Sequence, residues 1–206
     1  TKVVRPSGAI YTAWDVSKVE KMNEMFGQAL KFNEELDNWN TTNCTDMSFM
    51  FYNAIEFNKD INSWDTSSVT NMSGMFSYAT NFNGIITAWD VSQVSDLSGM
   101  FDNADKFNQN ISVWNVANCS KYTNMFNNAR NFDQNLGNWT LGPVITGGNG
   151  MDTMFNGAFQ ITQTNADWTG TTLFKSGMLS NIFQFYSDST NYDGVTQGTT
   201  SYPKIF

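Results

Sequence analysis

A small group of side chains in this sequence is of types that could do acid–base chemistry. Glu34, Glu35 and Asp37 form an acidic cluster that could supply a general acid and a general base. The cluster recurs nowhere else in the sequence, and no candidate nucleophile accompanies it. The chain also contains no histidine, the side chain that most often serves as a general base or a metal ligand. We therefore expect a protein that is not an enzyme.

Other side chains are candidates for a metal site. Asp15, Asp65 and Asp90 each follow a tryptophan and could form a row of carboxylates suited to calcium. Asparagine or threonine takes the same position elsewhere in the chain, and a hydroxyl side chain often follows two residues later. This pattern favours capping of a helix start over metal binding. The 11 methionines mostly recur at fixed positions typical of a core. We expect neither a metal nor a cofactor.

Composition excludes some classes of partner. The 206 residues include 11 basic and 19 acidic side chains, and the resulting net charge of −8 disfavours a nucleic-acid partner. No apolar run approaches the roughly 18 residues that a membrane span needs. The first residues contain neither an initiator methionine nor a signal sequence, so we expect a soluble chain that is a mature product or a fragment.

A repeat organises the whole chain. Its tryptophans form one series in which the first five intervals are each 25 residues and the last is 29. Met-Phe and a following Ala recur behind each of the first six tryptophans, and the first five units continue with Phe-Asn or Phe-Asp and then Ile or Leu, so that the unit is W-[DN]-x-[ST]-x-V-x-x-M-x-x-M-F-x-x-A-x-x-F-N-x-x-I-x-x. The series consists of Trp14, Trp39, Trp64, Trp89, Trp114, Trp139 and Trp168.

Two periodicities within the unit predict its local structure. Val69, Met72, Met75 and Ala79 are spaced so that they would share one face of a helix of about three turns. The short Ile-x-x-Trp stretch is the only segment suited to a strand. Because one coil cannot bury its own apolar face, successive coils must stack. The expected fold is an α/β, leucine-rich-repeat-like solenoid of about six to seven 25-residue helix-plus-short-strand coils.

We expect one domain spanning residues 1–206. Residues 1–13 are a lead-in, 14–167 are repeats, and 168–206 are a degenerate last repeat with an aromatic C-terminal cap. A glycine-rich insertion within residues 142–150 should loop out without breaking the stack. Cys44 and Cys119 occupy the same position of units that are three repeats apart, too far for a disulfide, so both should be buried free thiols.

The phrases WDTSSVTNMSGMF (residues 64–76) and WDVSQVSDLSGMF (residues 89–101), each followed by A-x-x-F-N, resemble a known repeat. It is the 25- to 26-residue repeat of the bacterial surface protein and mycoplasma lipoprotein family, known as DUF285 or BspA-like repeats. The resemblance covers residues 14 to 168 and implies a leucine-rich-repeat-like solenoid displayed outside the cell. Related proteins are associated with adhesion, and the family brings no catalytic residues.

These observations predict a non-catalytic, secreted or cell-surface module that binds a protein or a glycan on a host, cell or neighbouring surface. The alternative is a structural module that self-associates through the ends of the solenoid or packs with neighbouring domains. Variable positions beside the invariant Ile or Leu and Trp would form the binding ridge, while an ordinary solvated face would vary in the same way. The candidate binding residues are Glu35, Asp37, Asp60, Asn62, Thr87, Asn110, Ser112 and Asn135.

One further column has two interpretations. Asn33, Asn58, Asn83 and Asn108 each follow a repeated phenylalanine and could bind sugar. Buried asparagines that tie one repeat to the next through backbone hydrogen bonds are the favoured interpretation.

Overall fold

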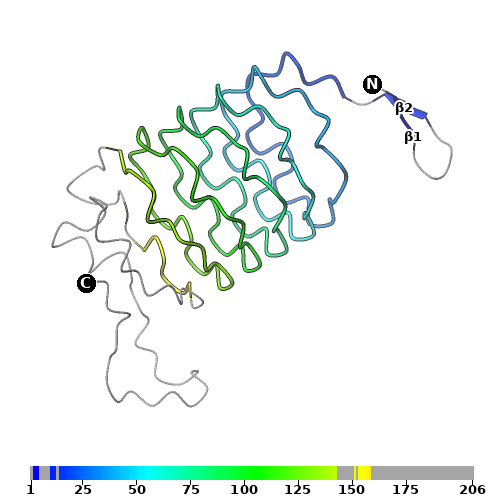
Figure 1. The fold of residues 1–206 in the computed structure, drawn as a ribbon. Helices are drawn as coiled ribbons and strands as arrows, with labels where there is room; N and C mark the ends of the chain where they lie inside the picture. Colours follow the sequence, from blue (N-terminus) through cyan, green and yellow to red (C-terminus); the bar gives the residue numbers. More distant parts are fainter. Residues whose placement is uncertain (1, 5–9, 13, 143–150, 152, 159–206) are drawn as a thin grey trace, which may run out of the picture.

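A computed structural model describes residues 2–4, 10–12, 14–142, 151 and 153–158 of the chain. Near the N-terminus, β1 (Lys2–Val4) pairs antiparallel with β2 (Ile10–Thr12), and Lys2 lies opposite Thr12. The remaining described residues form a stack of coils that follow one another in sequence order (Figure 1). We number a coil from one tryptophan of the series to the residue before the next, so that residues 39–63 are one coil and 64–88 its neighbour.

Backbone hydrogen bonds join neighbouring coils mainly along one part of each coil. In coil 39–63 this part is residues 46–54, which we call the turn segment together with its equivalents in the other coils. Alternate N–H groups of the turn segment donate to carbonyl oxygens of the next coil, at distances of 2.7 to 3.0 Å. The four bonds run from Met47 to Asn71, Phe49 to Ser73, Phe51 to Met75, and Asn53 to Ser77.

The intervening N–H groups of the turn segment close tight turns within their own coil. Met50 donates to Met47, Tyr52 to Phe49 and Ala54 to Phe51, each three residues back, at 3.0 to 3.3 Å. The chain can alternate in this way because residues four apart adopt the left-handed backbone conformation, with φ of 54° at Phe49 and 55° at Asn53. Most coils place glycine or asparagine at these positions, which favour that conformation.

The predicted helix is therefore wrong. The described residues contain no helix, because alternate N–H groups donate to the next coil and so cannot reach carbonyls four residues back. An apolar spacing of three and four residues also fits a run of tight turns, which is why the pattern is misleading. The asparagine or aspartate after tryptophan does accept a local hydrogen bond as expected, from Ser67 N–H to Asp65 Oδ1 at 3.1 Å, but it closes a turn.

The predicted strand is wrong as well. The Ile-x-x-Trp stretch forms a tight turn in each coil from 14–38 to 114–138, as when Trp64 N–H donates to the Ile61 carbonyl at 3.2 Å. Among the residues that the structure describes, parallel pairing between coils consists of single bridges at the start of the turn segments. They join, in order, Lys21, Asp46, Asn71, Asp96 and Lys121. The α/β, helix-plus-short-strand architecture is thus replaced by coils built of turns.

Columns of aromatic rings form the core. Phe51, Phe76 and Phe101 are fully buried and stack on one another with ring centroids 5.5 and 5.8 Å apart. A second phenylalanine column lies against the first, with Phe76 and Phe82 centroids 3.8 Å apart. The described tryptophans that follow Trp14 form a further buried column, in which the ring centroids from Trp39 to Trp114 are 6.1 to 6.4 Å apart. These tryptophans are Trp39, Trp64, Trp89, Trp114 and Trp139.

The first coil is less covered than the inner ones. Trp14 is 67% exposed, and Phe26 is 7% exposed whereas Phe51 is fully buried. Cys44 and Cys119 are both buried and free, as predicted. The aromatic cap predicted for 168–206, Trp168 and most of the glycine-rich insertion lie outside the described residues.

Candidate functional site

All eight predicted binding residues lie in the part of the coil that follows the second phenylalanine. In coil 39–63 this part is residues 58–63, which we call the return segment together with its equivalents. Only one backbone hydrogen bond links return segments of neighbouring coils among the described residues, from Ile61 N–H to the Ile85 carbonyl at 3.3 Å. The stacking brings residues of equivalent position, such as Asp37, Asn62 and Thr87, onto successive coils.

Several predicted residues use their side chains to join coils. Asp60 Oδ1 accepts a hydrogen bond from Ile85 N–H at 2.8 Å, and Asn62 Oδ1 accepts one from Ala88 N–H at 2.8 Å. Asp37 Oδ1 likewise accepts from a backbone N–H of the next coil, at 3.0 Å. These side chains replace the backbone acceptors that a strand would supply, so part of the predicted ridge has a structural role.

The other predicted residues are engaged locally or exposed. Asn110 Oδ1 accepts from Ser112 N–H at 3.1 Å, and Asn135 Oδ1 accepts from a backbone N–H two residues on at 2.7 Å. Glu35 forms an ion pair with Lys59 at 2.8 Å. Thr87 is half-buried. The structure places all of these residues on one face, and their binding role stays a prediction.

A shallow, open depression of about 590 Å³ lies beside this ridge. Two polar columns flank the buried second-phenylalanine column and line it: the residue before each phenylalanine and the asparagine after it. The asparagine column was weighed from the sequence as a sugar-binding row with a structural role favoured, whereas the residues before each phenylalanine were not among the predicted binding residues. The groove is lined by Asn33, Glu56, Asn58, Asn81, Asn83, Lys106 and Asn131.

The asparagines of the groove form hydrogen bonds through their amide oxygens only. Asn33 Oδ1 accepts from Asn58 N–H at 2.9 Å, and Asn58 Oδ1 accepts from Asn83 N–H at 2.7 Å. The expected coil-to-coil asparagine links are thus confirmed, although these three side chains are exposed rather than buried. Within the described part of the chain, none of their Nδ2 groups makes a hydrogen bond. A row of amide donors, one per coil, therefore faces the groove.

Charged groups add to this row from the opposite column. Glu56 and Lys106 line the same groove, with Asn81 between them in the column. Main-chain bonds hold this column: Asn81 N–H donates to the Ile55 carbonyl at 3.3 Å and Lys106 N–H to the Thr80 carbonyl at 3.2 Å. The groove thus offers donors, an acid and a base at fixed spacing.

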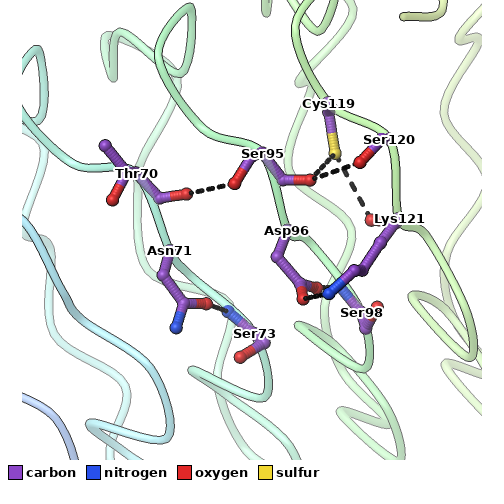
Figure 2. A network of polar contacts seen from close by, with 9 residues as sticks. All are labelled: Thr70, Asn71, Ser73, Ser95, Asp96, Ser98, Cys119, Ser120 and Lys121. Carbon is purple, nitrogen blue, oxygen red and sulfur yellow. Dashed lines mark hydrogen bonds and ion pairs between the residues drawn. The ribbon is translucent and has the colours of Figure 1, made fainter. Parts of the chain in front are cut away.

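A second polar face, at the start of the turn segments, is occupied by its own contacts (Figure 2). The hydroxyl groups of Thr70, Ser95 and Ser120 each donate to a carbonyl of the preceding coil, at 3.1 to 3.4 Å. Both oxygens of Asp96 are engaged, one by Lys121 at 3.0 Å and the other by a backbone N–H at 2.9 Å. This face holds coils together and offers less to a ligand than the groove.

The carboxylates after the tryptophans are also engaged locally. Hydrogen bonds from the Ser67 hydroxyl and backbone hold the pKa of Asp65 below its usual value, and the same contacts from Ser17 lower the pKa of Asp15. The described residues contain no cluster of three or more His, Cys, Asp or Glu side chains that could hold a metal ion. Burial raises the pKa of Cys119 to about 11, so its thiol stays protonated at neutral pH.

A family model described as "Mycoplasma protein of unknown function, DUF285" matches residues 7–77 and 57–168, most of the repeated region. The chain belongs to the DUF285 family. This membership agrees with the resemblance carried by the Trp-Asp-x-Ser and Met-Phe phrases of the repeat. Comparisons with curated proteins and with solved structures give no match. The described residues contain no helix that is long and apolar enough to cross a membrane.

Proposed function

We propose that this DUF285 repeat protein is a non-catalytic, secreted or cell-surface module that binds an extended protein or glycan along its amide groove. The observation that carries the proposal is the row of unpaired Nδ2 donors on Asn33, Asn58 and Asn83, one per coil, beside Glu56 and Lys106. A row with coil spacing suits a ligand that repeats along its length.

Two further features support this proposal. The groove lies beside the ridge of predicted binding residues, so a ligand could contact both. The chain has no histidine, and the acidic groups near the groove include an ion pair, Glu35 with Lys59, rather than a pair of free carboxylates. Display outside the cell rests on the resemblance to bacterial surface proteins.

Glycan and protein arrays probed with the chain test the proposal. Replacing Asn81 and Lys106 together by alanine removes two groove side chains that make no side-chain hydrogen bond within the described residues, so the fold should persist. We expect affinity for an array ligand to fall roughly tenfold or more. The matched control is Lys18→Ala with Asn23→Ala on the first coil, outside the groove, which should bind normally. Equal loss in both variants contradicts the groove.

A second candidate function, self-association, is favoured by the first coil. Trp14 is 67% exposed, and Leu30 and Met25 are 46% and 38% exposed. Among the described residues, no backbone N–H donates to the carbonyls of Asn23 and Met25, whose equivalents in inner coils accept bonds from a preceding coil. This edge could receive a coil from a second chain. Light scattering over a range of protein concentrations tests it, and a constant monomer mass would exclude it.

A further inference from the structure

Two coils depart from the repeat at the left-handed positions of the turn segment. Phe49 has φ of 54° and Tyr78 has φ of 59°, although bulky side chains disfavour this conformation. The rings are 41% and 44% exposed, so burial does not offset that cost. Every coil adopts this conformation at both positions, so the unusual feature is the exposed aromatic side chain and not the backbone conformation. Equivalent positions hold small or polar residues: Glu24, Gln28, Asn53, Gly74, Gly99, Asn103, Asn124, Asn128, Thr153 and Gly157.

The exposed rings of Phe49 and Tyr78 form a cluster with the half-buried ring of Tyr52. Phe49 and Tyr52 meet edge to face at 6.0 Å and 78°, and Tyr52 and Tyr78 meet at 6.0 Å and 80°. An edge-to-face contact covers a face of only one ring of the pair, and the exposed fractions of Phe49 and Tyr78 show that part of the ring surface stays accessible to a ligand. The Phe49 ring lies over Gly74, since a Cβ atom there would collide with it. At Gly99, on the next coil, a Cβ atom would meet only Asp102 Cβ, at 3.9 Å, so there is open space beside Asp102.

Polar acceptors continue the same surface on the following coils. Tyr52, Asp102 and Asn127 occupy equivalent positions. Asp102 Oδ1 accepts from the Nδ2 groups of Asn103 and Asn127, both at 2.7 Å. Within the described residues Asp102 Oδ2 accepts no hydrogen bond, and Asn127 Oδ1 is buried without a donor. Asp102 is half-buried, so its second oxygen remains open to a donor that a ligand would supply, whereas Asn127 Oδ1 is closed off from solvent.

We propose that the turn-segment surface from Phe49 to Asn127 is a binding site for a neutral, β-linked saccharide chain. The C–H face of a hexose would lie on the exposed surface of the rings, and its hydroxyls would donate to the second oxygen of Asp102. Neighbouring coils are about 4.8 Å apart, a spacing comparable to the length of one hexose unit. The net charge of −8 and the Asp102 carboxylate disfavour an anionic saccharide.

This site is separate from the amide groove. The groove is lined by the residues flanking the second phenylalanine column, whereas the rings belong to the turn segments that precede it. Loss of one site therefore leaves the other intact. The two sites share no residue, so a negative result at one site does not exclude binding at the other.

Isothermal titration calorimetry of the whole chain with cellotetraose and with the tetrasaccharide of β-1,4-linked N-acetylglucosamine tests the proposal. The double variant Phe49→Gly with Tyr78→Asn places at each position a residue that neighbouring coils already use there. We expect affinity to fall roughly tenfold or more while the melting temperature stays equal or rises, because strain is relieved. The matched control is Ile85→Asn, an exposed apolar residue of a return segment, 41% exposed, which should bind as the parent does.

Three outcomes would overturn the proposal. One is that neither tetrasaccharide binds the parent chain. The second is that Phe49→Gly with Tyr78→Asn binds as tightly as the parent or no more weakly than Ile85→Asn. The third is a clearly lower melting temperature of the double variant, which would show that the rings pack for stability rather than for a ligand. Binding lost only in the double variant supports it.

Discussion

The turn segment and the return segment of a coil both form hydrogen bonds to the next coil, but they use different groups to do so. In the turn segment, Phe49 and Phe51 donate their N–H groups directly to carbonyls of the next coil. In the return segment, side chains such as Asn58 Oδ1 and Asp60 Oδ1 accept from the next coil instead. The difference teaches that left-handed residues let the backbone reach its neighbour, whereas a segment without them depends on amide and carboxylate side chains.

Both segments pack on the same aromatic core. A substitution in this core should cause the largest loss of stability. Phe76 is fully buried and stacks on Phe51, Phe82 and Phe101. Phe76→Ala should reduce the free energy of unfolding by about 3–5 kcal/mol, since it leaves a cavity in place of four ring contacts, the fourth being with Trp89. Urea unfolding measures this loss. A variant that unfolds at the parent's midpoint would contradict the role of the column.

The next prediction tests how much the left-handed backbone of the turn segment affects stability. Asn53 has φ of 55°, and its side chain makes no hydrogen bond within the described residues. Asn53→Ala should destabilise the protein by about 1–2 kcal/mol, because a Cβ-bearing residue without a local polar group disfavours the left-handed conformation. Asn53→Gly is the control and should be neutral or mildly stabilising. Thermal unfolding compares the two, and equal melting temperatures would refute the strain argument.

A smaller effect isolates the side-chain links of the return segment. Asn58→Ala removes the acceptor for Asn83 N–H and should reduce the free energy of unfolding by about 1 kcal/mol. Asn58→Asp keeps an oxygen acceptor and should stay close to the parent. The same denaturation experiment reads both variants. Equal free energies of unfolding for the alanine and aspartate variants would mean that water takes the place of the asparagine oxygen. The side-chain links would then not be what holds the return segments together.

The smallest effect is a pH dependence at the turn-segment surface. Burial raises the pKa of Asp102 above its usual value, against the opposing hydrogen bonds from Asn127 and Asn103. The folded state therefore binds this proton more tightly than the unfolded state, and stability falls as pH rises from the unfolded pKa through the folded one. Asp102→Asn should remove this slope and leave stability at pH 7 equal or higher. Melting temperatures between pH 3 and pH 7 measure it.

The sequence predicts the period and the buried columns well, because a spacing of 25 residues repeats the same types and stacking must align them. The links from Asn33 to Asn58 and onward are predicted for the same reason. Local structure is not, since apolar residues such as Met72, Met75 and Ala79 have the spacing of a helix and also of successive tight turns. The recurring asparagine and glycine at left-handed positions were the missed signal.

The candidate site is predicted only in part. The return segments hold all eight predicted residues, yet Asp60 and Asn62 prove to be coil-to-coil acceptors, because a sequence cannot show where a carboxylate finds its donor. The groove forms because the second phenylalanines are buried while their polar neighbours on both sides line the surface. The sequence does not show the depth of that burial. The ring cluster depends on contacts between Tyr52 and Tyr78 on different coils.

The interfaces between inner coils repeat the same columns of hydrogen bonds and stacked rings. No one of these interfaces should therefore resist a mechanical pull much better than another. A pull on the chain ends would act first on a terminal coil, whose single neighbour holds it less firmly than the two that hold an inner coil. The stack would then peel in equal steps, each releasing one 25-residue coil and lengthening the chain by about 80–90 Å at full extension. Such stepwise yielding would dissipate force gradually instead of in one event.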